Sequence, residues 1–404
     1  MANPALDCIT ADFLEKILRK SEKDDTIRVS KISTKPATNK GDNYTSDMYR
    51  VVAELSHVRN GRKVNEKSVI VKIAPQDGVR ISLVKDSKIF DTEITMMLEP
   101  LTRMNELLGP PHRLSARCLY YQLQDPVLLV LEDLAPLGFR MVDRQAGLDW
   151  DHCVLALKNL ANFHASSVAL CEREPKWKTT FVNGIFRKNA VPQLAAFFSR
   201  GTKALGEEVA NWPELGPRYS EKILKLADVA YERGVKAAEC REGEFNVITH
   251  GDFWVNNMLF RHDDKGRPID HIFVDFQMCA YTTPVVDLQY FLYTGPTQEL
   301  FEEKAKLLEE YHKMLCSTMA RLGCKTAPPT FETLKKTMED REDYGMIAVF
   351  TVLPILLVDK DKAQSLDELM NNKEEYNNSG YKCSIYRKVM TKLLPYYEAK
   401  GMLD

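Results

Sequence analysis

The stretch from Val247 to Phe260 constrains the fold most, together with the apolar run from Ile272 to Gln277 that follows it. A polar turn with one glycine separates the two. Short apolar runs on either side of such a turn predict a β-hairpin. This hairpin would bring the side chains of Asp252, Asn257 and Asp275 to one end.

These three polar side chains suit phosphoryl transfer. Oxygen-bearing groups on a rigid frame bind a hard cation and the phosphates that accompany it. A kinase-type site needs one Asp to meet the acceptor hydroxyl, then an Asn and a second Asp to hold magnesium. We therefore predict Asp252 as the catalytic residue and Asn257 and Asp275 as metal ligands.

The alternative is that Asp252 and Asn257 only cap turns, as Asp and Asn often do. That interpretation leaves Asp275 unexplained, because this residue interrupts an apolar run in which an unpaired carboxylate would be costly to bury. A bound magnesium ion would offset that cost, so the sequence favours the metal site.

Lys72 interrupts another apolar run, from Val69 to Ala74. Taken alone, it is equally a lysine on an edge strand whose stem covers apolar surface. Beside the predicted site, we interpret it as the lysine that reaches the α- and β-phosphates of a nucleotide and is held by a helical carboxylate. Glu93 is the best candidate for that carboxylate, since it lies in the middle of the helix expected after the strand. Asp91 is the rival, and Glu99 is a weaker one.

Two polar segments are predicted to contact the nucleotide through the backbone. The turn that contains Gly41, Asn43 and Ser46 lies between two predicted strands, and its N–H groups can point at phosphate oxygens. It lacks the G-x-G-x-x-G pattern, so an ordinary hairpin turn is an equal alternative. The crossing that contains Glu132 and Leu134 would present N–H and C=O groups to an adenine edge, although its acidic side chains can simply be solvated. The pattern G-x-x-x-x-G-K-[ST] does not occur, which argues against a P-loop enzyme.

Three further polar residues have predicted supporting roles. His250 comes two residues before the catalytic Asp, and we expect it to brace the loop by hydrogen bonding. Asp287 either caps a helix or hydrogen-bonds the catalytic loop, and the sequence leaves both open. His164 falls on the apolar face of its helix, where we expect a satisfied core histidine rather than a catalytic one.

The order of predicted elements indicates an α+β chain with two lobes. The N-terminal lobe holds a first amphipathic helix and an antiparallel sheet that carries one long helix, and the larger second lobe is mainly helical around the hairpin. We place the lobes at 1–131 and 139–404, with a hinge at 132–138. The predicted strands of the first lobe cover 27–34, 47–56, 69–74, 118–122 and 127–131, and its helices cover 9–20 and 87–106. In the second lobe, helices are predicted over 149–170, 190–210 and 219–238.

Composition narrows the class of protein. The chain has 404 residues with a net charge of −2, and 44% of them are hydrophobic, as in ordinary globular proteins. This balance predicts no broad basic face for nucleic acid or anionic lipid. Nine singly scattered cysteines argue against a disulfide framework or a zinc site. We see no secretory signal, and the longest apolar run, Met346 to Val358, is too short to span a bilayer and predicts a buried helix. We therefore expect a cytoplasmic protein without an obligate protein partner.

Three motifs resemble one known family. The sequences V-I-T-H-G-D-F-W-V-N-N-M-L-F, F-V-D-F-Q and P-V-V-D-L-Q-Y-F-L are similar to those of the ecdysteroid kinase-like family, a branch of the choline kinase and aminoglycoside phosphotransferase group. The resemblance implies a protein kinase-like fold, ATP, magnesium, and phosphorylation of a hydroxyl on a small molecule, with ecdysteroids as the named case. It assigns catalysis to Asp252, metal binding to Asn257 and Asp275, and phosphate binding to Lys72 with Glu93 as its partner.

Other kinase classes fit the sequence less well. Choline kinases carry a third carboxylate in a D-F-E triplet where this chain has Gln277, which argues against a quaternary ammonium substrate. The aromatic residues Trp254, Phe276, Tyr290 and Phe291 suit a steroid-like alcohol as acceptor, or they only pack in the core. A protein kinase needs a longer segment than 278–283 before the next helix. A pseudokinase that only binds ligands is disfavoured, because the predicted site keeps all of its four key residues, which are Lys72, Asp252, Asn257 and Asp275.

Overall fold

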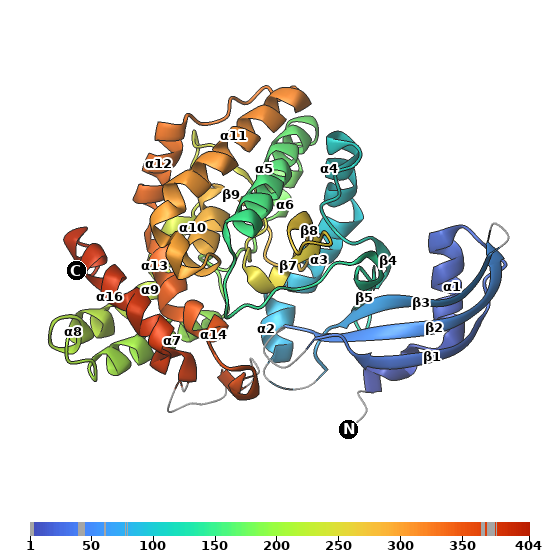
Figure 1. Cartoon of the computed structure of the whole chain (residues 1–404), viewed down its shortest axis with the longest axis horizontal. Coiled ribbons are helices and arrows are strands. Elements are labelled where there is room, and N and C mark those ends of the chain that lie inside the picture. The colour runs from blue at the N-terminus through green and yellow to red at the C-terminus, as the bar shows by residue number, and fades with distance from the viewer. Residues whose placement is uncertain are drawn as a thin grey trace.

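The computed structural model describes residues 4–38, 45–59, 62–76, 78, 80–364, 368, 369, 376 and 378–404. Its N-terminal part contains a five-stranded antiparallel sheet in the order β1-β2-β3-β5-β4. The strands are β1 (Val29–Pro36), β2 (Asp47–Arg59), β3 (Arg62–Ile73), β4 (Cys118–Gln122) and β5 (Leu128–Glu132). Figure 1 shows this sheet at one end of the molecule and the helical part at the other. The predicted α+β class is confirmed.

The first helix, α1 (Ala11–Glu22), packs against the sheet. It begins at Thr10, whose hydroxyl oxygen accepts a hydrogen bond from the Phe13 N–H at 3.1 Å. Such a cap satisfies one of the N–H groups that the first turn of a helix leaves without a partner. Leu14 and Leu18 on its inner face are fully buried in the same apolar cluster as the strands.

The prediction of a single helix over 87–106 is wrong, because the segment forms two helices, α3 (Ile89–Leu98) and α4 (Pro100–Leu108). Pro100 starts the second one, since proline lacks the N–H that a helix interior needs but fits the first turn. A short helix that the sequence did not predict, α2 (Arg80–Asp86), precedes them. Most residues of α3 are buried, and this burial carries Glu93 into the protein interior.

The C-terminal part is built around α5 (Trp150–Arg173), as predicted, and α11 (Lys304–Leu322) packs along it. The helix expected over 219–238 is two helices, α8 (Gly216–Leu226) and α9 (Ala230–Ala238). The other helices named below are α6 (Trp177–Thr180), α7 (Pro192–Val209), α10 (Val285–Thr294), α13 (Asp343–Thr351), α14 (Leu353–Leu356) and α16 (Ser384–Ala399).

The predicted hairpin is confirmed as β7 (Met258–His262) paired with β8 (Pro268–Phe273). The strand β8 ends before Asp275, so the last apolar residues of the predicted run leave the sheet. A second small sheet, which the sequence did not predict, pairs β6 (Val247–Thr249) with β9 (Ala280–Thr282). Together the two sheets hold residues 250–257 and 274–279 as loops between strands.

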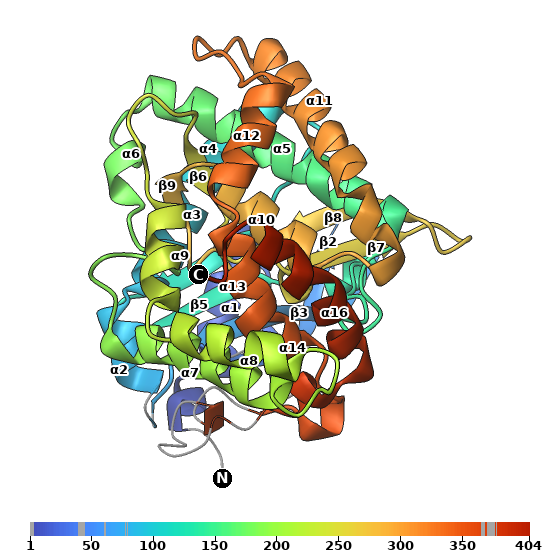
Figure 2. The same ribbon diagram turned by 90° about the vertical axis from the view of Figure 1, so that its left-hand side faces the viewer.

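The apolar run from Met346 to Val358 is buried, as expected, but it forms α13 and α14 instead of one helix. Pro354 lies in the first turn of α14, where its missing N–H is tolerated. Helix α7 packs against α8 and α13, and Figure 2 shows these helices with α16 on one side of the molecule. They form a second apolar core, separate from the one around α5.

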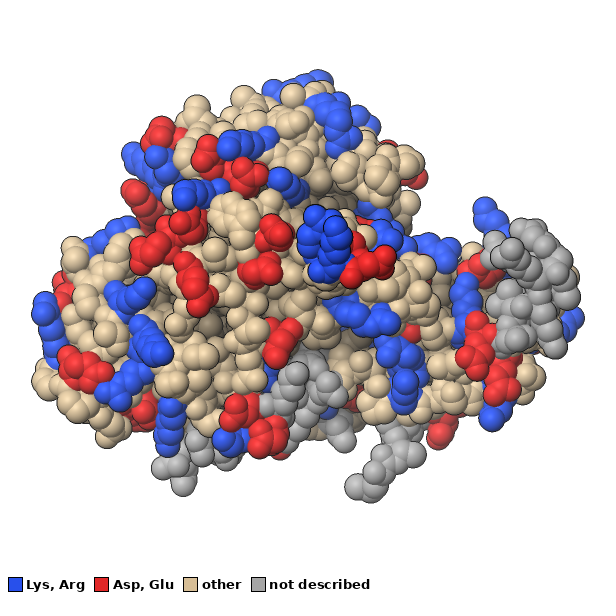
Figure 3. Space-filling view, in the orientation of Figure 1, with Lys and Arg blue, Asp and Glu red and all other residues tan. Residues whose placement is uncertain are grey.

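The surface carries charges of both signs. On the face shown in Figure 3, Lys and Arg side chains are interspersed with Asp and Glu, which agrees with the net charge of −2. Among the described residues, no helix has the length and apolar character needed to cross a membrane. All nine cysteines are free thiols.

Phe163 of α5 tests how strongly this core supports the hairpin. Its ring lies 5.6 Å from that of Phe273 and 6.0 Å from that of Phe276, between centroids. We expect Phe163→Ala to lower the free energy of unfolding by about 3–5 kcal/mol, because it leaves a cavity that the core cannot close. Urea denaturation measures this change. The control is Ile269→Ala on β8, where the side chain is 52% exposed and the expected change is within about 0.5 kcal/mol. Equal effects would show that the α5 contact does not support the hairpin.

Candidate active site

Gly251 fixes the turn that follows β6. Its φ is +80°, and a Cβ at this position would lie 1.9 Å from the backbone oxygen of Met278. Only glycine adopts this backbone conformation without strain and leaves room for so close an approach. The turn therefore holds the loop that carries Asp252 directly against the segment that follows Asp275.

Asp287, in the first turn of α10, anchors the same loop. Its two carboxylate oxygens accept hydrogen bonds from the backbone N–H groups of His250 and Gly251, each at 2.8 Å. The sequence left open whether Asp287 caps a helix or hydrogen-bonds the loop, and the structure contains the hydrogen bonds to the loop. Every atom involved is buried, so the loop is held by charge-assisted hydrogen bonds in an interior where such bonds are strong.

His164 of α5 completes this support. Its Nε2 lies 2.9 Å from Asp287 Oδ2, and its Nδ1 lies 2.8 Å from the hydroxyl of Tyr311 on α11. The imidazole is fully buried with both nitrogens hydrogen-bonded, as expected for a satisfied core histidine. It holds the carboxylate of Asp287 in place, and through that carboxylate it supports the loop.

His250 links the loop to the end of the hairpin. Its Nε2 lies 3.1 Å from the backbone oxygen of Val274, and its ring packs 5.0 Å from that of Phe276. Burial lowers the pKa of His250 below its usual value, so the neutral ring is the stable form at neutral pH. The expected bracing hydrogen bond is therefore present, and it joins the start of the loop that carries Asp252 to the residue before Asp275.

Asp252 is oriented by two neighbours. The Asn257 amide donates to the Asp252 backbone oxygen and to its Oδ2, both at 2.9 Å. The Tyr290 hydroxyl donates to Asp252 Oδ1 at 3.1 Å. Burial, with the nearby charge of Asp275, raises the pKa of Asp252 to about 7. A carboxyl group with such a pKa can take up a proton at neutral pH, as a general base must.

Lys72 bridges two carboxylates from distant parts of the chain. Its Nζ donates to Glu93 Oε2 at 2.6 Å and to Asp275 Oδ1 at 2.8 Å. Burial alone would lower the pKa of Lys72, but the two carboxylates outweigh it and raise the pKa. Asp91 is exposed and Glu99 pairs with Lys176 at 3.1 Å, so Glu93 is the one of the three candidates that holds the lysine.

Asp275 occupies a strained backbone conformation. Its φ is +67°, in the left-handed region that residues other than glycine rarely adopt. Strain of this kind costs about 1–3 kcal/mol and persists where the surroundings fix the residue. Here the hydrogen bond from Lys72 and the end of β8 fix it, and the carboxylate is turned toward the lysine.

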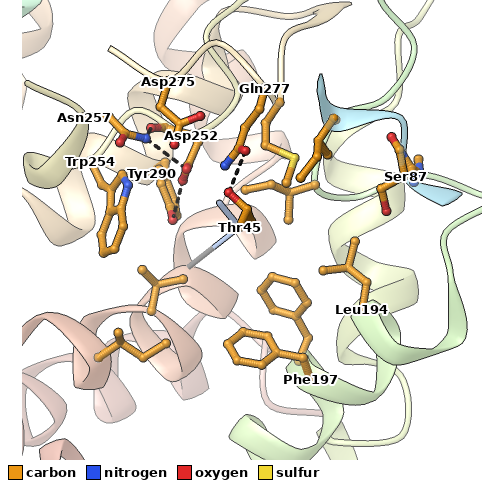
Figure 4. A pocket seen from close by; sticks show the side chains of 18 of the residues that line it. Thr45, Ser87, Leu194, Phe197, Asp252, Trp254, Asn257, Asp275, Gln277 and Tyr290 are labelled. Carbon is orange, nitrogen blue, oxygen red and sulfur yellow. Dashed lines mark hydrogen bonds between the residues drawn. The ribbon is translucent and has the colours of Figure 1, made fainter. Parts of the chain in front are cut away.

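Two cavities meet at these residues. The first, which we name the Lys72 cavity, includes among its lining residues Lys72, Glu93, Glu132, Leu134, Asn257 and Asp275. The second, the Tyr290 cavity, is shown in Figure 4, and its lining includes Asp252, Trp254, Asn257, Asp275, Gln277 and Tyr290. Asn257 and Asp275 line both cavities. A group bound at these two side chains would therefore contact molecules in both.

Asn257 and Asp275 fit a magnesium ion. Within the described ranges, no three His, Cys, Asp or Glu side chains are grouped so that they could hold a metal. Two protein oxygen ligands are nevertheless enough for Mg²⁺, which keeps several waters and binds substrate phosphates as further ligands. The donor set therefore favours magnesium that arrives with a nucleotide over a metal held by protein side chains alone.

The crossing at 132–138 is described in full, and its contact with an adenine edge stays a prediction. The Glu132 side chain is not solvated, because it pairs with Arg113 and accepts from the Arg117 N–H at 3.2 Å. The Glu132 N–H donates to the Arg117 carbonyl at 3.0 Å, and the Leu134 carbonyl accepts from two N–H groups further along the chain. These two backbone groups are therefore already bonded within the protein, although both residues line the Lys72 cavity.

The predicted phosphate turn is tested only at its end. Gly41 and Asn43 lie outside the described residues. Ser46 is buried just before β2, and it is not among the described residues that line the Lys72 cavity. Its neighbour Thr45, which the sequence analysis missed, donates to Gln277 Oε1 at 2.7 Å. The two residues are 232 positions apart, so no local pattern could have revealed this contact.

A second missed interaction lies at the start of the crossing. Arg50 of β2 donates to both carboxylate oxygens of Asp133, at 2.7 and 3.2 Å. Both residues line the Lys72 cavity. The acidic side chain of Asp133, which sequence reasoning left as a possible solvated group, therefore ties the crossing to the sheet.

Comparison with known proteins gives the family. A family model described as the ecdysteroid kinase-like family matches residues 40–324. No curated protein matches the chain.

Phosphotransferases are among the solved structures that resemble this chain. The aminoglycoside phosphotransferase APH(2'')-IIa, in a complex with streptomycin and ATP, is 16% identical with a TM-score of 0.38, over 89% of this chain and 99% of that one. Macrolide 2'-phosphotransferase MphH from Brachybacterium faecium is 13% identical with a TM-score of 0.36, over 90% and 99%. Spectinomycin phosphotransferase APH(9)-Ia is 12% identical with a TM-score of 0.41, over 91% and 99%.

The family match covers well over half of the chain and includes the loop, the hairpin, Lys72 and Glu93. The protein therefore belongs to the ecdysteroid kinase-like family and is an ATP-dependent small-molecule kinase.

Proposed function

We propose that the protein uses magnesium and ATP to phosphorylate a hydroxyl group on an apolar small molecule, an ecdysteroid or a similar hydroxylated metabolite or xenobiotic. The observation that carries this proposal is the position of Asn257 and Asp275 in the lining of both cavities. A phosphoryl group passes from one bound molecule to another, so its donor and acceptor must meet at a shared point. We place the nucleotide in the Lys72 cavity and the acceptor in the Tyr290 cavity.

Each side chain of the site then has a role in the transfer. Lys72, fixed by Glu93, would bind the α- and β-phosphates and orient the nucleotide. Asp252 would accept a hydrogen bond from the acceptor hydroxyl and take its proton, while Tyr290 and Asn257 keep the carboxylate oriented. Asn257 and Asp275 would hold magnesium, which when bound supplies charge neutralisation for the transferring group.

The lining of the Tyr290 cavity supports an apolar acceptor. Away from Asp252 its walls are largely apolar, with Leu194, Phe197, Val352 and Ile355 among them. Asp252 and Asp275 are the carboxylates among the described lining residues, and both belong to the proposed transfer site. A quaternary ammonium acceptor would therefore lack a separate anionic partner, and Gln277 is already bonded to Thr45. These features favour a steroid-like alcohol over choline or ethanolamine.

The proposed lobes at 1–131 and 139–404 would place the nucleotide between the sheet and the hairpin. The Lys72 cavity supports this division, since its lining includes residues of β2, β3 and β5 in the sheet and of β7 in the hairpin. We also propose that the protein acts in the cytoplasm, where ATP is abundant, without an obligate protein partner.

A panel of acceptors tests the function. Purified protein with magnesium and ATP is incubated with ecdysteroids, other hydroxylated steroids, choline and a kinase substrate peptide, and phosphorylated products are measured by mass spectrometry. We expect one or more apolar alcohols to be phosphorylated and choline and the peptide to be left unchanged. Binding of ATP without any phosphorylated alcohol would instead indicate a protein that only binds ligands.

Asp252→Asn removes the proposed proton acceptor and keeps the shape of the side chain. We expect kcat to fall by at least about 100-fold, the size of effect that a positioned general base usually provides. The affinity for magnesium-ATP, measured by calorimetry, should stay within about threefold of wild type, since the residue lies on the acceptor side. A large loss of ATP affinity with normal kcat would contradict the assignment.

Asp275→Asn tests the metal assignment. Wild-type protein should melt at a higher temperature with ATP plus magnesium than with ATP alone, because ligand binding to the native state stabilises it. We expect Asp275→Asn to lose most of this magnesium-dependent shift and nearly all turnover, as measured by thermal unfolding and product formation. Asp270→Asn, at an exposed ion pair on β8, is the matched control and should behave like wild type. If Asp275→Asn kept the magnesium-dependent shift, the metal would be bound elsewhere.

A further inference from the structure

The Tyr290 cavity has a second polar corner, formed by Ser87 and Arg187. Ser87 lies in the turn between α2 and α3, and Arg187 lies in the segment between α6 and α7. In Figure 4, Ser87 lies on the opposite side of the cavity from Asp252, Asn257 and Tyr290. Neither residue takes part in the transfer proposed above.

Ser87 has a buried hydroxyl group without a hydrogen-bond partner among the described residues. The residue is 4% exposed. A buried hydroxyl without a partner costs about 1–3 kcal/mol. Because the residue lines the cavity, a molecule bound there can supply the missing hydrogen bond.

Arg187 is a partly buried cation without a carboxylate. Its Nη1 donates to the Ser87 carbonyl oxygen at 3.3 Å, and no ion pair joins its guanidinium to any carboxylate of the described residues. Burial lowers the pKa of Arg187 below its usual value. A guanidinium has five N–H donors, so most of its bonding capacity is still available.

Two buried arginines of this protein, Arg341 and Arg144, make more hydrogen bonds to the protein than Arg187 does. Arg341 donates to the carbonyl oxygens of Ala237 and Glu239, at 2.7 and 2.8 Å, and it pairs with the carboxylate of Glu244. Arg144 donates to three carbonyl oxygens, each at 3.0 Å or less. These side chains bind the protein itself, whereas the Arg187 guanidinium lines a cavity and makes one long hydrogen bond to the part of the chain that the structure describes.

We infer that the acceptor carries an anionic oxygen group, a carboxylate in the simplest case, at the end away from the hydroxyl that is phosphorylated. Its oxygens would accept hydrogen bonds from the Arg187 guanidinium and the Ser87 hydroxyl, and its apolar body would lie against Leu194 and Phe197. This inference rests on the proposed function for the position of the reacting hydroxyl. The preferred substrate class is then a hydroxylated apolar acid, such as a hydroxy fatty acid or a steroid acid.

Binding of matched acids and esters tests the inference without turnover. The probes are ω-hydroxy fatty acids of graded chain length and cholate, each beside its methyl ester, with magnesium and a non-hydrolysable ATP analogue present. Calorimetry gives the dissociation constants. We expect at least one acid to bind about tenfold more tightly than its ester, the order that one charge-assisted hydrogen bond supports.

Variants test whether Ser87 and Arg187 cause the preference for the acid over the ester. Arg187→Gln should remove the preference for the acid and leave the affinity for the ester within about twofold, and Ser87→Ala should reduce the preference about threefold. Arg187→Lys keeps the positive charge and should retain part of the preference for the acid. If it does, the loss in Arg187→Gln is due to the lost charge and not to a folding defect. The control is Lys188→Gln at the next position, where the side chain is 75% exposed and pairs with Glu239. It should leave the preference unchanged.

Two outcomes would overturn the inference. One is equal binding of acid and ester, or no binding of any acid, by wild-type protein. The other is a preference that survives Arg187→Gln. Neither outcome affects the proposed function, which is measured separately by phosphorylation of any alcohol. Conversely, an acid preference that depends on Arg187 without any phosphorylated product would support the corner and contradict the kinase assignment.

Discussion

The two hydrogen bonds of Lys72 are the interaction on which the site depends. They join β3 of the sheet, α3 and the residue that follows the hairpin, which are far apart in the sequence. Charges are costly to bury unless they are paired, and here one lysine meets two carboxylates. Loss of Lys72 would leave both carboxylates in the interior without a cation, so the pairing fixes the elements that carry the three groups relative to one another. The same pairing holds Asp275 in its strained conformation.

The acceptor side depends on a second buried carboxylate. Asp287 receives hydrogen bonds from two successive backbone N–H groups and is itself held by His164. This arrangement fixes the backbone just before Asp252, while Tyr290, one turn further along α10, fixes the Asp252 side chain. Helix α10 therefore positions both the loop and its reactive group. In the proposed function, Asp275 is the fixed carboxylate on the phosphate side and Asp287 is the one on the hydroxyl side.

The sequence predicted well those features in which a polar residue interrupts an apolar pattern. Lys72 and Asp275 stood out for that reason, and the hairpin and most strands followed from alternation and turn residues. Its errors were of two kinds. Helix ends were misplaced where the prediction gave too little weight to proline, as at Pro100, which begins a new helix. Contacts such as Thr45 with Gln277, or Arg187 with the Ser87 carbonyl, join distant segments and leave no local pattern to detect.

The walls of the Tyr290 cavity were the least predictable part, and there is a physical reason. Phe197, Phe198, Val352 and Ile355 line the cavity and also belong to the apolar core formed by α7, α8, α13 and α16. In the sequence such residues have the same helical spacing as any core residue, because the core and the cavity wall are one continuous surface. A substitution in this core can therefore reshape the acceptor site without touching Asp252 or its partners. In the proposed function, nucleotide binding and phosphoryl transfer rest on a few buried charges, so a change in this core would alter the acceptor preference and leave the transfer site the same.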